Sequence, residues 1–112
     1  ILGHRERRAM GEDNTLVNKK LKSAIKSGLS PILCVGEVER DEDHEYLNFI
    51  KTQIEECLKG YARNSLSSLI IAYEPVWAIG KGASPATAEQ FFEMSIFIRK
   101  VLSGICGRDI PA

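Results

Sequence analysis

The sequence predicts an α/β protein whose parallel strands alternate with helices. The tail of a strand at 1–3 and two apolar runs, 31–35 and 69–73, alternate with segments that carry apolar residues at helical spacing. The run 31–35 is apolar without alternation, which is typical of a parallel strand covered on both faces. Parallel strands need long crossovers, usually helices, so the predicted order is strand, helix, strand, helix, strand, helix.

The composition predicts one small domain that binds neither nucleic acid nor a membrane. The 112 residues carry 15 Lys and Arg against 15 Asp and Glu, so the net charge is zero. A basic surplus for nucleic acid or anionic lipid is absent from the sequence, and its apolar runs are far too short to span a bilayer. Cys34, Cys57 and Cys106 are odd in number and far apart, which predicts reduced thiols in a cytoplasmic protein.

Both ends of the sequence predict a piece of a larger protein. The chain has no initiator methionine and opens inside the apolar run Ile1-Leu2-Gly3. Its last residues, 107–112, resemble the lead-in to a further element.

The first two helices are predicted from their boundaries. His4 ends the first strand, and the charged residues 5–8 open a helix or form a solvated face. Further on, Asp13 or Asn14 caps a helix that Gly28 ends. The apolar positions of this helix are Val17, Leu21, Ala24 and Ile25.

Acidic residues from Glu37 to Glu45 lead into a third helix that runs to about Lys59. His44 is interpreted as a surface residue, because no second metal ligand stands four residues on. Cys57 lies on the apolar stripe and is interpreted as a core residue rather than a nucleophile. That stripe comprises Leu47, Ile50, Ile54, Cys57 and Leu58.

The last helix follows a predicted loop at 64–68 and the third strand. Thr87 caps this helix, and Gln90 three residues later completes a capping box. Its predicted inner face consists of Phe91, Ile98, Val101 and Leu102.

Chemically active residues follow all three predicted strands. His4, Glu37 and Glu74 stand at the carboxyl ends, and sites of α/β proteins are built at that edge. Glu74 ends an apolar run and precedes a proline and the glycine-rich residues 80–82, whose amides suit an anion. On this pattern alone, Glu74 is either a catalytic base beneath a closing loop or a solvated loop residue.

Three motifs resemble the triosephosphate isomerase family. Residues 3–8 read G-H-R-E-R-R, residues 34–37 read C-V-G-E, and residues 73–82 read Y-E-P-V-W-A-I-G-K-G. The resemblance implies a (β/α)8 TIM barrel of ~250 residues. The chain would be a fragment from strand 4 to helix 6, with three parallel strands and three main helices, and 1–112 would be part of a single barrel domain.

The resemblance also implies an activity. The family interconverts dihydroxyacetone phosphate and D-glyceraldehyde 3-phosphate, in glycolysis and gluconeogenesis, as a homodimer without cofactor or metal. Glu74 would move the proton through an enediolate, and His4 would polarise the carbonyl. This family is itself the standard example of a glutamate base beside a neutral histidine.

A closing lid is implied by the third motif. Gly80 would offer its backbone N–H to the substrate phosphate. The first hinge of the lid would comprise Pro75, Val76 and Trp77.

Supporting roles are implied for other residues of the motifs. Glu37 and Tyr73 would hold Trp77 in its open or closed position. Glu6 would pair with the family's active-site lysine, or form an ordinary surface ion pair. Cys34 would be a structural thiol under the site.

The sequence departs from the family at several places. Arg5 replaces a serine and would either pair with Glu74, lowering its basicity, or carry its charge out to solvent. The turn after Arg8 is one residue short, Lys81 replaces threonine, and one residue is added before Thr87.

Two other functions remain open at this point. One is a non-catalytic phosphate-binding or assembly remnant of the fold, which Arg5 favours. The other is a different phosphate-binding barrel enzyme, which the joint presence of His4, Glu37 and Glu74 disfavours. The 112 residues alone are predicted to be inactive.

Overall fold

The computed structural model describes residues 1–40, 44–61, 68–78 and 85–106. Two strands, β1 (Ile32–Val35) and β2 (Ile70–Tyr73), pair in parallel. Their register sets Ile32 opposite Ile70 and Val35 opposite Tyr73. The predicted α/β class with parallel strands is therefore confirmed, and the predicted loop at 64–68 falls mostly outside the described residues.

The prediction of three strands is wrong for the part of the chain described. Residues 1–3 contribute only one parallel bridge, from Leu2 to Leu33. The Leu2 N–H donates to Ile32 at 2.8 Å, and Leu2 accepts from Cys34 at 2.8 Å. Gly3 then takes a φ of 71°, which turns the backbone out of the ladder before a strand can form.

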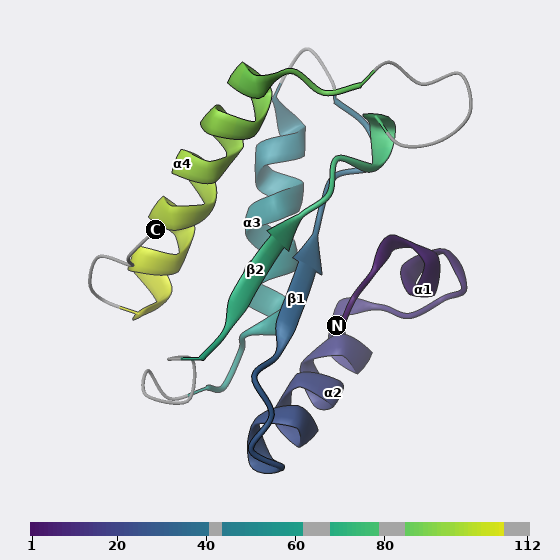
Figure 1. The fold of residues 1–112 in the computed structure, drawn as a ribbon, viewed down its shortest axis with the longest axis vertical. Helices are drawn as coiled ribbons and strands as arrows, with labels where there is room; N and C mark the ends of the chain where they lie inside the picture. Colours follow the sequence, from purple (N-terminus) through teal and green to yellow (C-terminus); the bar gives the residue numbers. More distant parts are fainter. Residues whose placement is uncertain (41–43, 62–67, 79–84, 107–112) are drawn as a thin grey trace.

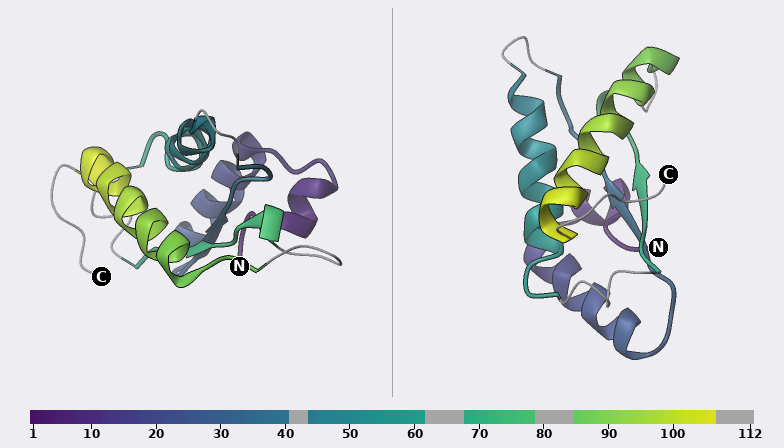
Figure 2. Two further views of the ribbon diagram at one scale, coloured as in Figure 1. Left: turned by 90° about the horizontal axis from the view of Figure 1, so that it is seen from above. Right: turned by 90° about the vertical axis from the view of Figure 1, so that its left-hand side faces the viewer.

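Four helices accompany the sheet in the described part of the chain. They are α1 (Arg5–Ala9), α2 (Asn14–Lys26), α3 (Glu45–Cys57) and α4 (Ala88–Cys106), and a short 3₁₀ turn, η2, spans Val76–Ala78. Figure 1 shows the two strands side by side, with α2 below the start of β1. Figure 2 shows that α3 and α4 lie on the same side of the sheet.

The core lies between the sheet and the helices α2, α3 and α4. Alternation along the strands sends Leu33 and Val35 of β1 into it, while Ile70 of β2 points to the other face and is 55% exposed. The predicted stripes of α2 and α3 are largely confirmed. The helix residues that are buried in the core are Val17, Leu21, Ile50, Ile54, Cys57, Met94, Ile98 and Leu102.

The predicted inner face of α4 is wrong at one end. Phe91 is 44% exposed, whereas Met94 is 1% exposed and takes the buried position. Met94, Ile98 and Leu102 recur at four-residue intervals and form the buried stripe of α4. This stripe begins about one helical turn after Phe91 and does not include it. Phe91 instead stands edge-on to Tyr73, with ring centroids 5.7 Å apart.

The predicted helix caps at Asp13 and at Thr87 are confirmed. Asp13 accepts a hydrogen bond from the Leu16 N–H at 2.9 Å. Thr87 and Gln90 bond reciprocally, at 2.7 and 3.1 Å. His44 is exposed as predicted and precedes α3 in a left-handed conformation. Within the described residues, no helix is long and apolar enough to cross a membrane.

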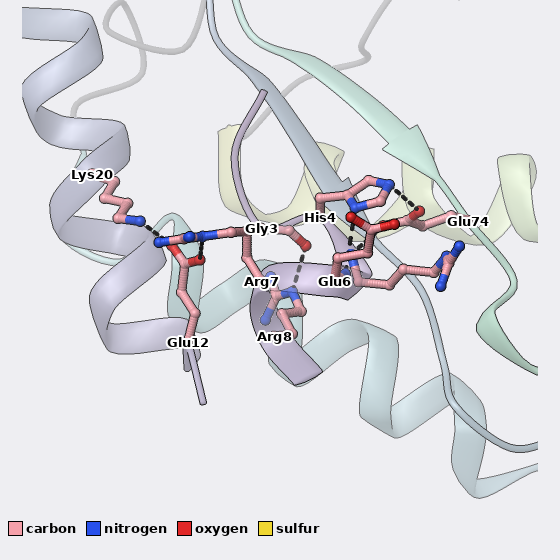
Figure 3. A network of polar contacts seen from close by, with 9 residues as sticks. Gly3, His4, Glu6, Arg7, Arg8, Glu12, Lys20 and Glu74 are labelled. Carbon is pink, nitrogen blue, oxygen red and sulfur yellow. Dashed lines mark hydrogen bonds and ion pairs between the residues drawn. The ribbon is translucent and has the colours of Figure 1, made fainter. Parts of the chain in front are cut away.

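A buried carboxylate, which the sequence did not reveal, ties α1 to α2. Glu12 is 7% exposed and accepts from Lys20 at 2.7 Å and from Arg7 at 3.2 Å (Figure 3). The hydrogen bond from Lys20 lowers the pKa of Glu12, and Arg7 lowers it further, although burial opposes both.

The Glu12 contacts are expected to contribute stability near neutral pH. A carboxylate with a lowered folded-state pKa stabilises the fold above that pKa, and the contribution is lost as the pH falls through it. Glu12→Gln should therefore lower the free energy of unfolding at pH 7 by about 1–3 kcal/mol. The difference should shrink on acidification, measured by denaturant titration followed by circular dichroism.

Glu55→Gln is the matched control, because Glu55 is exposed on α3. Equal stability of the Glu12 and Glu55 variants at pH 7 would contradict this role.

Candidate functional site

The carboxyl ends of the two strands bring the predicted site residues together. Glu74 follows β2, and its N–H donates to Val35 at 2.8 Å, which extends the ladder by one bond. His4 caps the start of α1 beside this strand end. The His4 Nε2 lies 3.4 Å from the Glu74 Oε2, and Figure 3 shows the two side chains facing each other.

The hydrogen bonds of His4 indicate its protonation state. Its Nδ1 accepts from the Glu6 N–H at 3.3 Å, so this nitrogen carries no proton. The proton of the neutral ring is then on Nε2, which faces the carboxylate of Glu74. The arrangement therefore holds a neutral imidazole with its donor directed at the strand-end acid.

The second oxygen of Glu74 is also occupied. Its Oε1 accepts from the backbone N–H of Arg5 at 2.8 Å, and the carboxylate side chain is 17% exposed. In the described part of the chain, the Arg5 guanidinium forms no ion pair with Glu74. Arg5 is instead among the residues that line a cavity of about 890 Å³ between α1 and α3. Arg5 thus holds the carboxylate through its main chain.

Gly36 permits the close approach of the two strand ends. A Cβ at this position would lie 1.7 Å from the Glu74 carbonyl oxygen, which leaves no room for any side chain. The Gly36 N–H donates to Gln53 of α3 at 2.9 Å. Sequence reasoning missed Gln53, although a glutamine on the apolar stripe between Ile50 and Ile54 was a signal of a buried polar contact.

A second polar cluster surrounds Glu37, which is 1% exposed. The Tyr73 hydroxyl donates to its Oε1 at 2.7 Å, and Arg40 contacts its Oε2 at 3.4 Å. Burial raises the pKa of Tyr73, and the bond to Glu37 raises it further, so the phenol stays protonated as a donor.

Trp77 is held by Arg40. The Arg40 guanidinium carbon lies 5.2 Å from the Trp77 ring centroid and 4.6 Å from that of Tyr46. The Trp77 Nε1 is buried, and no hydrogen-bond acceptor reaches it among the described residues. Glu37 and Tyr73 therefore bond to each other in this conformation, and their link to Trp77 passes through Arg40.

Arg40 was missed by sequence reasoning. The available signal was its charge, because Arg40 is the only Lys or Arg in the acidic stretch 37–45.

The remaining predicted residues lie in different places. Glu6 is exposed on α1, and Pro75 is buried ahead of Val76, which begins η2. Gly80 lies outside the described residues, as does Lys81.

Cys34 and Cys57 are both buried free thiols. Burial raises the pKa of Cys34, and the nearby charge of Glu74 adds to the rise. Their interpretation as structural thiols agrees with this burial. Within the described ranges, no group of three His, Cys, Asp or Glu side chains is placed to hold a metal ion.

Comparison with known proteins finds matches over nearly the whole chain. The family model for triosephosphate isomerase matches residues 1–110. The chain is 46% identical to the triosephosphate isomerase of Protochlamydia amoebophila, over 98% of this chain and 42% of the relative. It is 47% identical to that of Dehalococcoides mccartyi, over 96% of this chain and 42% of the relative.

A third relative gives the same result. The triosephosphate isomerase of Geobacter metallireducens is 49% identical over 91% of this chain and 41% of its own length. The chain thus spans less than half the length of the relatives it matches. Because the family model covers nearly all of the chain, the chain belongs to the triosephosphate isomerase family.

Proposed function

We propose that the chain is part of a triose-phosphate isomerase that interconverts dihydroxyacetone phosphate and D-glyceraldehyde 3-phosphate. The proposal rests on the distance of 3.4 Å between the His4 Nε2 and the Glu74 Oε2. Both residues lie in motifs that resemble those of this family. The non-catalytic alternative is not favoured, because the relatives matched over 91–98% of the chain are named triosephosphate isomerase.

In this proposal Glu74 is the base. Its carboxylate takes a proton from the carbon beside the substrate carbonyl, and the electrons of that C–H bond form the C=C bond of an enediolate. The carbonyl π electrons move onto oxygen, where the Nε2–H of His4 donates a hydrogen bond to the developing charge. Glu74 then returns the proton to the neighbouring carbon, and the hydroxyl proton moves by way of His4 from one enediolate oxygen to the other, which completes the aldose–ketose exchange.

The observed contacts of Glu74 describe the site without substrate. One carboxylate oxygen accepts from the Arg5 N–H and the other faces His4. Both contacts occupy the carboxylate oxygens of Glu74 and compete with its use as a base. A substrate that enters beside His4 would replace the histidine contact and release the carboxylate for proton transfer.

The supporting roles belong to the same proposal. Gly80 donates its N–H to the substrate phosphate, and Pro75, Val76 and Trp77 form the first hinge of the lid. Glu6 pairs with a lysine elsewhere in the complete protein. No cofactor or metal is proposed.

The assembly is also proposed from the family. Residues 1–112 form part of a single TIM-barrel domain, and the complete protein is a cytoplasmic homodimer. The domain's remaining strands would cover the face on which Ile70 is exposed.

Replacing the proposed base should lower the catalytic rate directly. In the complete protein, Glu74→Gln should lower kcat by about 10²–10⁴-fold, the usual contribution of a general base, with little change in KM. A coupled assay in both directions measures this effect. Glu93→Gln, at an exposed position of α4, is the control and should retain the original kcat. Equal activity of the two variants would reject Glu74 as the base.

The charge of Arg5 should restrain the base. Arg5→Ser keeps the backbone N–H that bonds Glu74 but removes the positive charge that follows His4 in the chain, so kcat should rise. The expected increase in kcat is less than about tenfold, because no direct ion pair is lost among the described contacts. Arg5→Lys preserves the charge and should leave kcat low. An unchanged or lower kcat in Arg5→Ser would contradict the idea.

The isolated 112-residue chain should be inactive. It spans about 42% of the length of its relatives, so most of the barrel that would surround the substrate lies outside it. A coupled assay on the purified chain should detect no turnover. Turnover that disappears in its Glu74→Gln variant would overturn this expectation.

A further inference from the structure

We propose that Arg40 is a positioning residue that fixes the segment bearing Glu74 from both sides. The catalytic part of this inference rests on the proposed function of Glu74 as a base. The positional part rests on contacts that are independent of any activity.

The contacts of Arg40 converge on the end of β2. Its Nε lies 3.4 Å from the Glu37 Oε2, and Glu37 accepts from the Tyr73 hydroxyl at 2.7 Å. The same guanidinium lies 5.2 Å from the ring centroid of Trp77. Tyr73 immediately precedes Glu74, and Trp77 follows it by three residues. Arg40 therefore acts on both sides of the proposed base Glu74. It reaches Tyr73 through Glu37, and it contacts Trp77 directly.

Because Arg40 and Glu37 are largely buried, the loss of either charge is expected to be costly. The Arg40 side chain is 17% exposed and that of Glu37 is 1% exposed. A carboxylate removed from water needs both hydrogen bonds and an opposite charge, and Arg40 is the cation that contacts Glu37 in the described residues. Removing the charge of Arg40 would leave Glu37 with the Tyr73 hydroxyl as its described partner, and the Tyr73 anchor would weaken.

Trp77 depends on Arg40 for a different reason. Its indole N–H finds no acceptor among the described residues, so none of the described hydrogen bonds fixes the ring. A guanidinium over an aromatic face supplies an electrostatic attraction that apolar packing lacks. Arg40 also lies over Tyr46, at 4.6 Å from its centroid, which limits the positions that the guanidinium can take. The indole is thereby held by a cation that is itself held in place.

The consequence for the reaction is geometric. A base must lie within hydrogen-bond reach of the proton it takes, and small displacements lower the rate steeply. If the two flanks of Glu74 loosen, fewer molecules hold the carboxylate in the productive position. Arg40 does not approach the Glu74 carboxylate in any described contact, so its loss should lower kcat more than it raises KM.

The test uses the complete protein with 5-fluorotryptophan incorporated, in which Trp77→Phe identifies the ¹⁹F resonance of Trp77. Arg40→Met removes the charge and keeps an unbranched apolar stem, whereas Arg40→Lys keeps the charge without the planar group. Lys51→Met is the control, because it removes an exposed cation from α3.

Arg40→Met should lower kcat by at least tenfold with KM within about threefold, and it should shift or broaden the Trp77 resonance. Arg40→Lys should recover part of kcat and part of the resonance position. Lys51→Met should change neither. If Arg40→Met does not fold, Arg40→Lys alone decides, since its resonance should lie away from that of the original protein and its kcat should fall severalfold.

An unmoved Trp77 resonance in the folded Arg40 variants would overturn the positional part. Equal losses of kcat in Arg40→Lys and Arg40→Met, with unchanged resonances, would assign Arg40 a general structural role and reject the proposal. If the original protein shows no isomerase activity, the proposed function fails, while the resonance still decides whether Arg40 holds Trp77.

Discussion

The parallel pairing of β1 with β2 is the interaction on which the other features depend. Because both strands run in the same direction, their carboxyl ends meet at one edge, and the hydrogen bond from Glu74 to Val35 carries the pairing past the last strand residue. Gly36 lets the two main chains meet there without a side chain between them. The positions of Glu37 and Glu74 relative to each other are therefore set by backbone contacts.

The two strand-end carboxylates occupy contrasting surroundings. Glu37 is 1% exposed and bonded to a phenol and a guanidinium, whereas the Glu74 side chain is 17% exposed and bonded to a main-chain amide and a neutral imidazole. Full burial with charged and hydroxyl partners suits a permanent structural acid. Partial exposure with neutral partners suits an acid that exchanges its contacts with a ligand. The same residue type is thus fully buried among charged and hydroxyl partners at one strand end, and at the next it has the partly exposed setting that we propose for the base.

Periodicity and short motifs predicted most of the elements and brought His4 and Glu74 to one place, because these depend on local spacing and on strand direction. The first strand was mispredicted because Gly3 adopts a positive φ that an apolar run does not reveal. Phe91 was mispredicted because hydrophobicity does not decide which apolar side of α4 is buried. Arg40 and Gln53 were missed because their partners lie on other elements, and their contacts exist only once the chain has folded.

The lack of space at Gly36 limits the substitutions that this protein tolerates. Every other residue type would place a carbon atom against the Glu74 carbonyl, so the restriction applies equally to small, polar and apolar replacements. Val38, two residues away, is 60% exposed and faces no such restriction. Substitutions at this strand end are therefore tolerated only where they leave the distance between the two main chains unchanged. A variant library across 34–40 should therefore yield folded members that differ at Val38 and share glycine at 36.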